Sequence, residues 1–170
     1  LDYLLEGQDT IPVDRGIFLN KTYRMHPKIN SFISDTFYES RLLFDSSTKN
    51  RKINFDKTQI KNNGINFIPA KHENFSQRNE VEGEIIKKLY REFIGCEFTD
   101  LDGSTRKLIV DDILTISPFN VQVNYLKSIL PKDSRVGTID KFQGQEAPIT
   151  IISMTSSDSE NLPRAKDFFF

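Results

Sequence analysis

The stretch ILTISPFNVQVNYLKSI, residues 113–129, contains the pattern that decides the fold. It opens with Ile113–Ser117, an almost unbroken apolar run, as expected of a strand that is buried on both faces. Val121, Tyr125 and Ile129 then recur at the spacing of one helix face. A strand that leads directly into a helix is the repeating unit of α/β domains.

Two β-branched runs downstream continue the alternation. Val136–Ile139 and Ile149–Met154 predict two more strands, separated by a polar bend that contains glycine. The alternation of strands and helices predicts an α/β fold with a mainly parallel central sheet flanked by helices. We expect one domain over residues 1–170, because a chain of 170 residues suits a single hydrophobic core.

Two amphipathic helices are predicted upstream of this region. The first spans about Pro27–Glu39 and begins with proline, whose missing N–H would have no partner at that position. The second begins after Asn79, which is followed three residues later by Glu82 as in a capping box, and it ends near Gly95. The apolar positions on one face of this second helix are Val81, Ile85, Leu89 and Phe93.

Shorter β-prone and polar segments fill the rest of the chain. Ile17–Asn20 and Ile65–Pro69 predict short strands. Ser46–Gly64 is polar and has no clear period, which indicates a surface excursion. Glu97–Val110 contains an Asp-Gly turn signal and predicts a hairpin. Residues 46–110 are therefore expected to hold a polar, β-rich insertion.

Composition limits the classes of function. Lysine and arginine (23) nearly balance aspartate and glutamate (24), so no bulk positive field would hold the domain on a nucleic acid, and any such contact must be local. Apolar runs are only a few residues long and no signal segment opens the chain, so we expect no membrane partner. The single cysteine, Cys96, cannot form an internal disulfide, which fits a cytoplasmic protein.

Three polar stretches follow predicted strands, at the edge where open parallel sheets bind ligands. They are NKTYRMHP (20–27), TISPFNVQ (115–122) and GTIDKFQGQEAP (137–148). In the first, the Tyr23 ring could stack on a base and the Arg24 guanidinium could bind phosphate oxygens. Residue chemistry by itself favours a simpler interpretation, in which the tyrosine packs on the sheet and the arginine pairs with a carboxylate.

The other polar side chains are equally open to interpretation. His26 is expected to start a helix, because no second histidine, cysteine or carboxylate lies at ligand spacing, and we predict no metal site. Gly144 permits close approach of the backbone, and Glu146 can accept hydrogen bonds from ribose hydroxyls. Thr138 could donate to a backbone phosphate, although an ordinary polar loop explains these residues equally well.

The three stretches together resemble helicases of superfamily 1B, the group that includes the nonsense-decay and replication nuclease-helicases. TYRMHP (22–27), with the helix that follows it, resembles their motif IV. VGTIDKFQGQEAPITIISM (136–154) resembles motif V, and ISPFNVQVNYL (116–126) resembles the intervening strand and helix. Similarity also surrounds RNEVEGEII (78–86), and similar strings occur in bacterial proteins that fuse a RecB-like nuclease to such a helicase.

The resemblance implies a RecA-like, P-loop NTPase-like domain, the second (C-terminal) of the two in such a motor. It implies that Tyr23 stacks near the adenine of ATP and that Arg24 reaches the γ-phosphate as an arginine finger. Gln143, Gly144 and Glu146 would meet the ribose and the phosphates.

The resemblance also implies a second group of contacts. Ser117, Pro118 and Thr138 would contact the backbone of a single-stranded nucleic acid, with DNA favoured over RNA. LPRAKDFFF (162–170) resembles the approach to motif VI but stops before the arginine of that motif, and its final apolar run, Phe168–Phe170, indicates an element that continues.

Half of a two-domain ATP site is missing from the sequence. No glycine begins a G-x-x-x-x-G-K-[ST] phosphate loop, and the acidic magnesium-binding motif is also absent. The resemblance implies that a preceding RecA-like domain of the same protein supplies both, so ATP and Mg²⁺ are the expected cofactors and the Mg²⁺ ligands lie outside this chain. We expect the fragment to be inactive by itself, in a parent protein of the bacterial cytosol.

A different class of function stays open. The chain could be a degenerate, non-hydrolysing module that binds nucleic acid or protein, with the basic stretch Lys49–Lys61 as its contact, although such runs are more often solvated loops. Nuclease activity within this segment is not expected, because no carboxylate cluster with a lysine stands at nuclease-like spacing.

Overall fold

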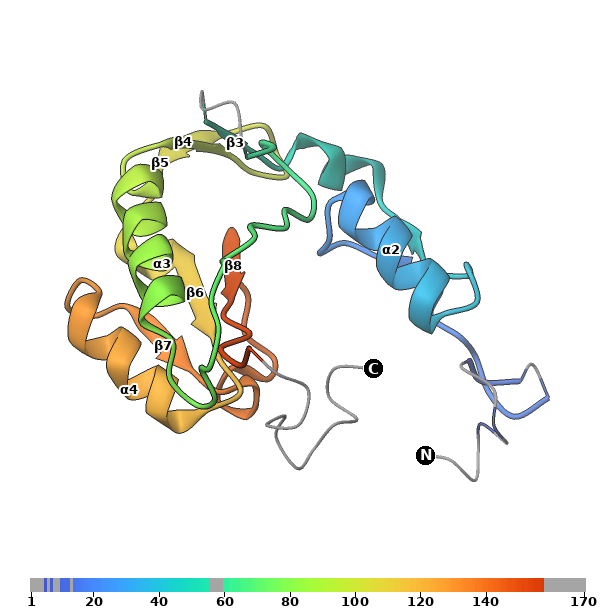
Figure 1. Cartoon of the computed structure of the whole chain (residues 1–170). Helices are drawn as coiled ribbons and strands as arrows, with labels where there is room; N and C mark the ends of the chain where they lie inside the picture. Colours follow the sequence, from blue (N-terminus) through green and yellow to red (C-terminus); the bar gives the residue numbers. More distant parts are fainter. Residues whose placement is uncertain (1–4, 6, 8–9, 13, 56–59, 158–170) are drawn as a thin grey trace. The chain divides into compact units, whose positions relative to one another are not determined.

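In the computed structural model, which describes residues 5, 7, 10–12, 14–55 and 60–157, a parallel sheet forms the core of one compact unit (Figure 1). This unit, unit 2, comprises Ile68–Cys96 and Lys107–Phe170, and unit 1 comprises Leu1–Phe67 and Glu97–Arg106. The strand order of the unit 2 sheet is β7-β6-β8, and both pairings are parallel. Its strands are β6 (Ile113–Ile116), β7 (Arg135–Gly137) and β8 (Ile149–Ile152).

The central strand β6 behaves as its apolar run predicts. Ile113 and Thr115 have no exposed surface and Leu114 is 4% exposed, so the strand is buried on both faces. Helix α4 (Asn120–Ile129) follows it, as expected. The predicted apolar face of α4 is wrong by about one residue, because Val121 is 47% exposed. The residues that α4 buries are Gln122, Val123 and Leu126.

Helix α3 (Glu80–Phe93) lies on the same side of this sheet as α4 (Figure 1). The Tyr90 hydroxyl, fully buried, is 2.9 Å from the hydroxyl of Thr115 on β6, and burial raises the pKa of this tyrosine. Gly83 allows α3 to approach α4, because a Cβ at this position would lie 2.4 Å from the Tyr125 ring. Val81 is 38% exposed, which contradicts its predicted place on the buried face. The buried residues of α3 are Gly83, Ile86, Leu89, Tyr90 and Phe93.

The start of α3 confirms half of the predicted capping box. The Asn79 side chain accepts a hydrogen bond from the backbone N–H of Glu82 at 3.0 Å, as an N-cap does. The reciprocal bond is not made, because the Asn79 N–H donates to Gln122 and the Glu82 carboxylate accepts from Thr155. Gly95, with φ of +87°, follows the helix end as predicted.

Unit 1 contains a small parallel sheet beside one helix. Strand β1 (Lys21–Thr22) pairs in parallel with β2 (Leu43–Phe44), and α2 (Pro27–Phe37) connects them. The helix is confirmed. The strand predicted at Ile17–Asn20 is wrong in position, because Ile17 is 89% exposed and the ladder begins only where the Asn20 carbonyl accepts from Leu43.

The expected insertion contains more order than its polar sequence predicts. The hairpin of β4 (Glu97–Thr99) and β5 (Thr105–Lys107) is confirmed, and β3 (Lys52–Asn54) extends it, in the order β3-β4-β5. A short 3-10 helix (Ser46–Asn50) precedes β3, within the stretch predicted as a surface excursion. Ile65–Pro69 forms no strand, because β-propensity without a paired neighbour does not make one.

Candidate functional site

Tyr23 lies immediately after strand β1 in unit 1. Its side chain is 61% exposed, so the ring does not pack into a core. The Lys21 ammonium lies 5.2 Å from the ring centroid and is also 2.6 Å from an Asp45 carboxylate oxygen. This ion pair ties β1 to the residue after β2, and it holds the ammonium over one face of the exposed Tyr23 ring.

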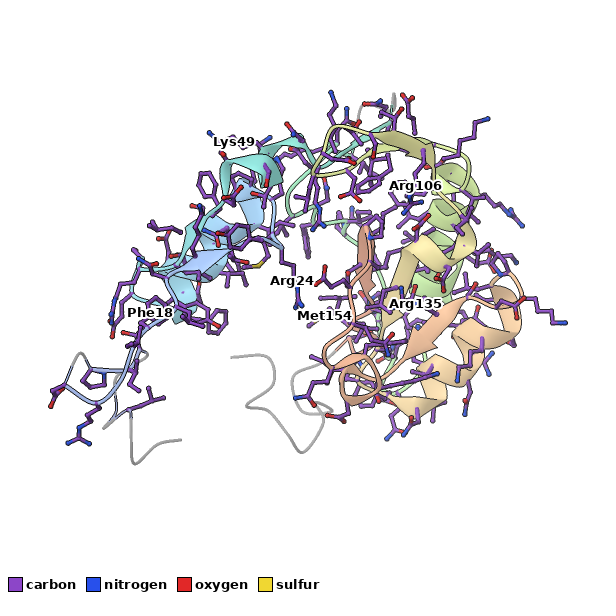
Figure 2. The ribbon with its side chains drawn as sticks, turned by 180° about the vertical axis from the view of Figure 1, so that it is seen from behind. Phe18, Arg24, Lys49, Arg106, Arg135 and Met154 are labelled. Carbon is purple, nitrogen blue, oxygen red and sulfur yellow. The ribbon has the colours of Figure 1, made fainter. Side chains whose placement is uncertain are left out.

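Arg24 sits in a backbone turn that is held from both sides. Its N–H donates to the Thr22 hydroxyl at 3.2 Å, and its carbonyl accepts a hydrogen bond from the Arg51 guanidinium. Arg51 is itself paired with Asp100 at 3.2 Å. The exposed Arg24 side chain extends away from the ribbon of α2 (Figure 2). The turn therefore fixes the peptide from which the exposed Arg24 side chain extends.

His26 starts helix α2, as predicted. Its Nδ1 accepts a hydrogen bond from the backbone N–H of Lys28 at 3.2 Å, which makes it the N-cap of the helix. Burial lowers the pKa of His26, and the Lys28 charge lowers it further. Within the described ranges, no group of three or more His, Cys, Asp or Glu side chains could hold a metal ion.

Two of the predicted nucleic-acid residues lie at the carboxyl edge of the unit 2 sheet with exposed surface. Pro118 and Thr138 are both half-buried, and they follow β6 and β7. Ser117 is different because it has no exposed surface, and its hydroxyl is 3.0 Å from the Thr155 hydroxyl. The expectation that Ser117 touches a nucleic acid is therefore wrong for this structure. Its backbone N–H instead donates to the Gly137 carbonyl at 3.1 Å and joins the two strand ends.

The loop from Thr138 to β8 runs from one edge of the sheet to the other. The Glu146 carbonyl accepts from Arg135, the first residue of β7, at 3.2 Å. The same guanidinium nitrogen donates to the carbonyl of Asp111, ahead of β6, at 3.0 Å. The backbone of Glu146 therefore lies at the amino edge, opposite Thr138, and the expectation that residues 137–148 gather beyond the carboxyl ends is wrong for Glu146.

Gln143, Gly144 and Glu146 are all exposed on this loop. Gly144 has φ of +80°, and a Cβ at this position would meet nothing within 4 Å, so backbone conformation and not crowding accounts for glycine here. Buried Phe142 anchors the start of the loop, and Gln145 accepts from Arg135 at 2.8 Å. Arg135 (Figure 2) is an anchor that the sequence pattern did not predict, since its contacts are distant in the chain.

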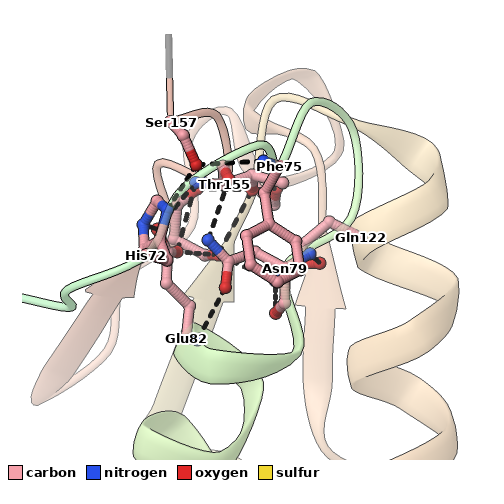
Figure 3. Close-up of polar contacts among 9 residues, drawn as sticks. His72, Phe75, Asn79, Glu82, Gln122, Thr155 and Ser157 are labelled. Atoms are coloured by element: carbon pink, nitrogen blue, oxygen red, sulfur yellow. Dashed lines mark hydrogen bonds and ion pairs between the residues drawn. The ribbon is translucent and has the colours of Figure 1, made fainter.

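A buried polar network lies beside the carboxyl edge of the unit 2 sheet (Figure 3). Glu82 at the start of α3 accepts hydrogen bonds from the chain that follows β8, and its carboxylate also lies 3.3 Å from His72 Nε2. Apart from the Asn79 to Glu82 spacing, no pattern in the sequence predicts this network. Its members are His72, Phe75, Asn79, Glu82, Ser117, Gln122, Ser153, Thr155 and Ser157.

A family model described as AAA domain matches residues 5–167, nearly the whole chain. The chain belongs to the AAA domain family. Sequence relatives of this AAA domain are the DNA polymerase alpha-associated DNA helicases A of Saccharomyces cerevisiae (30% identical, 84% of this chain) and Schizosaccharomyces pombe (28%, 83%). Regulator of nonsense transcripts 1 of Dictyostelium discoideum is 28% identical over 80% of this chain. The chain spans 23%, 23% and 11% of these three proteins, respectively.

These relatives support a helicase-type domain of superfamily 1, as the three motifs predict. The mixed α/β architecture with parallel sheets is consistent with the RecA-like, P-loop NTPase-like fold. None of the helices in the described part of this AAA domain is long and apolar enough to cross a membrane. The resemblance of 162–170 to the approach to motif VI concerns residues outside the described ones.

Proposed function

We propose that this AAA domain is the second motor domain of an ATP-dependent superfamily 1 helicase and that Arg24 acts in ATP hydrolysis. In this proposal a preceding RecA-like domain of the same protein holds the phosphates and Mg²⁺, for which the chain has no phosphate-loop sequence. The observation that carries the proposal is the anchored turn of Arg24. An exposed guanidinium on a peptide held by two hydrogen bonds is suited to reach a phosphate presented from outside.

Tyr23 supports the same assignment. Its largely exposed ring is suited to stack on an adenine. ATP would supply the free energy of phosphoryl transfer, and Arg24 would donate hydrogen bonds to the γ-phosphate oxygens as negative charge moves between them. Gln143, Gly144 and Glu146 are proposed to contact the ribose and phosphates, for which exposed side chains and a glycine turn are suitable.

The nucleic-acid surface is the second part of the proposal. Pro118 and Thr138 would contact the backbone of a single strand at the carboxyl edge, with Ser117 supporting them from beneath. The DNA helicases among the relatives favour DNA over RNA as the partner. The parent protein is also proposed to carry a fused RecB-like nuclease and to act in the bacterial cytosol. The gene sequence on either side of this chain tests both points.

Steady-state ATPase kinetics of the full-length protein test the role of Arg24. Arg24→Ala should lower kcat by about 10³-fold or more, the usual effect of losing an arginine finger, with less than about threefold change in the Kd of ATP. Arg91→Ala is the matched control, since Arg91 is an exposed arginine at the end of α3 and should leave kcat unchanged. Unchanged turnover in Arg24→Ala rejects the finger role. A wild-type protein that binds a single strand without hydrolysing ATP would favour the alternative of a degenerate interaction module.

A further inference from the structure

Glu82 is the centre of the buried network in unit 2. Its carboxylate accepts the Thr155 backbone N–H with both oxygens, at 3.0 and 3.1 Å, and the Ser153 hydroxyl at 2.5 Å. His72 Nε2 lies 3.3 Å away, and the two side chains are only 11% and 9% exposed. A carboxylate this buried is tolerated only when its oxygens are satisfied, so each of these donors stabilises its present position.

Thr155 is held by α3 through both of its backbone groups. Its N–H donates to Glu82, and its carbonyl accepts from Asn79 Nδ2 at 3.0 Å. Asn79 is fixed in turn by Gln122 on α4, whose amide oxygen accepts the Asn79 N–H at 2.8 Å and whose amide nitrogen donates to the Asn79 carbonyl at 3.1 Å. The start of α3 therefore bonds both backbone groups of Thr155, and Gln122 on α4 holds Asn79 in place for this.

The network continues from Thr155 to the carboxyl edge of the sheet. The Ser117 and Thr155 hydroxyls are 3.0 Å apart, and Ser117 directly precedes Pro118. The Ser117 N–H reaches the Gly137 carbonyl, next to Thr138. Hydrogen bonds thus connect the Glu82 carboxylate, through Thr155 and Ser117, to the chain neighbours of both residues proposed to meet a single strand.

The backbone at Thr155 is strained. Its φ is +69°, a left-handed conformation that β-branched residues rarely adopt and that costs of the order of 1–3 kcal/mol. Such a conformation persists where surrounding contacts determine it, and here Glu82 and Asn79 do so. Two residues after Thr155, Ser157 exchanges hydrogen bonds with the Phe75 backbone, and its hydroxyl lies 2.6 Å from His72 Nδ1. The segment is thus clamped at both ends (Figure 3).

We propose that Glu82 is a positioning residue for the single-strand surface. By holding Thr155 in its strained conformation, it fixes Ser117 and so keeps Pro118 and Thr138 in the arrangement that binds a nucleic-acid backbone. A surface ordered in advance binds more tightly, because less conformational entropy is lost on binding. The inference rests on the proposed function, and it assigns to Glu82 a part in nucleic-acid binding without contact with the strand.

The test is binding of a fluorescent single-stranded oligonucleotide by the full-length protein carrying Glu82→Gln. The amide has one accepting oxygen in place of two and carries no charge, so at constant size it cannot accept both the Thr155 N–H with two oxygens and the Ser153 hydroxyl. The Kd of the oligonucleotide should rise about tenfold, as expected when a preordered surface is lost. The salt dependence of binding should keep its slope, since the number of phosphate contacts is the same. The Kd of ATP without nucleic acid should not change.

Glu84→Gln is the matched control. Glu84 lies on the same helix, its side chain is 64% exposed, and it pairs only loosely with Lys87 at 3.5 Å. This variant should bind the oligonucleotide as wild type does. A tenfold weaker Kd in Glu84→Gln as well would overturn the assignment, because it would trace the effect to helix charge.

Thr155→Gly separates positioning from folding. Glycine adopts a φ of +69° without strain, so the melting temperature should fall by no more than a few degrees, while loss of the hydroxyl contact with Ser117 should raise the oligonucleotide Kd several-fold. Wild-type binding in folded Glu82→Gln and Thr155→Gly, or failure of both to fold, refutes the inference and leaves the network a support of the fold. If the wild-type protein itself binds no single strand, the proposed function fails instead.

Discussion

Replacing Asn79 by alanine should lower the stability of unit 2 by about 2–4 kcal/mol. Asn79 is fully buried, and its side chain has two separate tasks. It caps α3 through the Glu82 N–H, a contribution of about 1 kcal/mol, and it donates to the Thr155 carbonyl. A buried carbonyl that loses its donor costs about 1–3 kcal/mol, which gives the sum above. Asn79→Ser keeps an oxygen for the cap and lacks the amide donor, so it should lose about 1 kcal/mol less than alanine.

Urea unfolding of the chain, followed by far-ultraviolet circular dichroism, measures both variants against wild type. The order of stability should be wild type, then Asn79→Ser, then Asn79→Ala, with unchanged denaturant slopes. A loss below about 0.5 kcal/mol in Asn79→Ala would refute the reasoning, because neither task could then be significant. Equal stability of Asn79→Ser and wild type would show that the bond to Thr155 contributes nothing.

Two further predictions concern packing and pH. Gly137→Ala should destabilise by about 1–3 kcal/mol in the same unfolding assay, because a Cβ would lie 2.9 Å from the buried Phe142 ring, and wild-type stability would contradict this packing. The Lys21 ammonium, and then Ser47, hold the pKa of Asp45 well below its ordinary value of 3.8. A lowered folded-state pKa contributes stability that is complete above about pH 4 and is lost as the pH falls toward the folded value. Asp45→Asn should therefore flatten the acid limb of the stability curve between about pH 4 and 2, and an unchanged limb would exclude this ion pair as a cause.

The elements of regular period could be predicted from the sequence. Strand β6 with α4 and the helix α3 are where their apolar patterns place them, because burial in a core imposes those periods. The buried face is harder to predict, since neighbours distant in the chain decide it. Val121 is exposed because α4 turns Gln122 inward, where its amide pairs with the Asn79 backbone. A prediction that counts apolar positions cannot find a buried polar residue such as Gln122.

The candidate site was predictable only in part, for a related reason. Motif spacing predicts that residues such as Arg24 and Thr138 belong to the site, but it does not say which edge of the sheet a loop reaches. Glu146 lies at the amino edge because Arg135 binds its carbonyl, and that contact has no local signature. The clamp around Glu82 joins residues as far apart as His72 and Ser157, so its donors and acceptors become partners only in the folded chain.

The most direct test of the central claim is the affinity of the full-length protein for ADP with aluminium fluoride, an analogue of the phosphoryl-transfer transition state. If Arg24 stabilises that transition state, Arg24→Ala should weaken binding of the analogue by a factor comparable to its loss of kcat, about 10³-fold, and leave the affinity for a non-hydrolysable ATP analogue nearly unchanged. Equal affinity of wild type and Arg24→Ala for the aluminium fluoride complex would contradict the assignment of Arg24 as the residue that completes the ATP site.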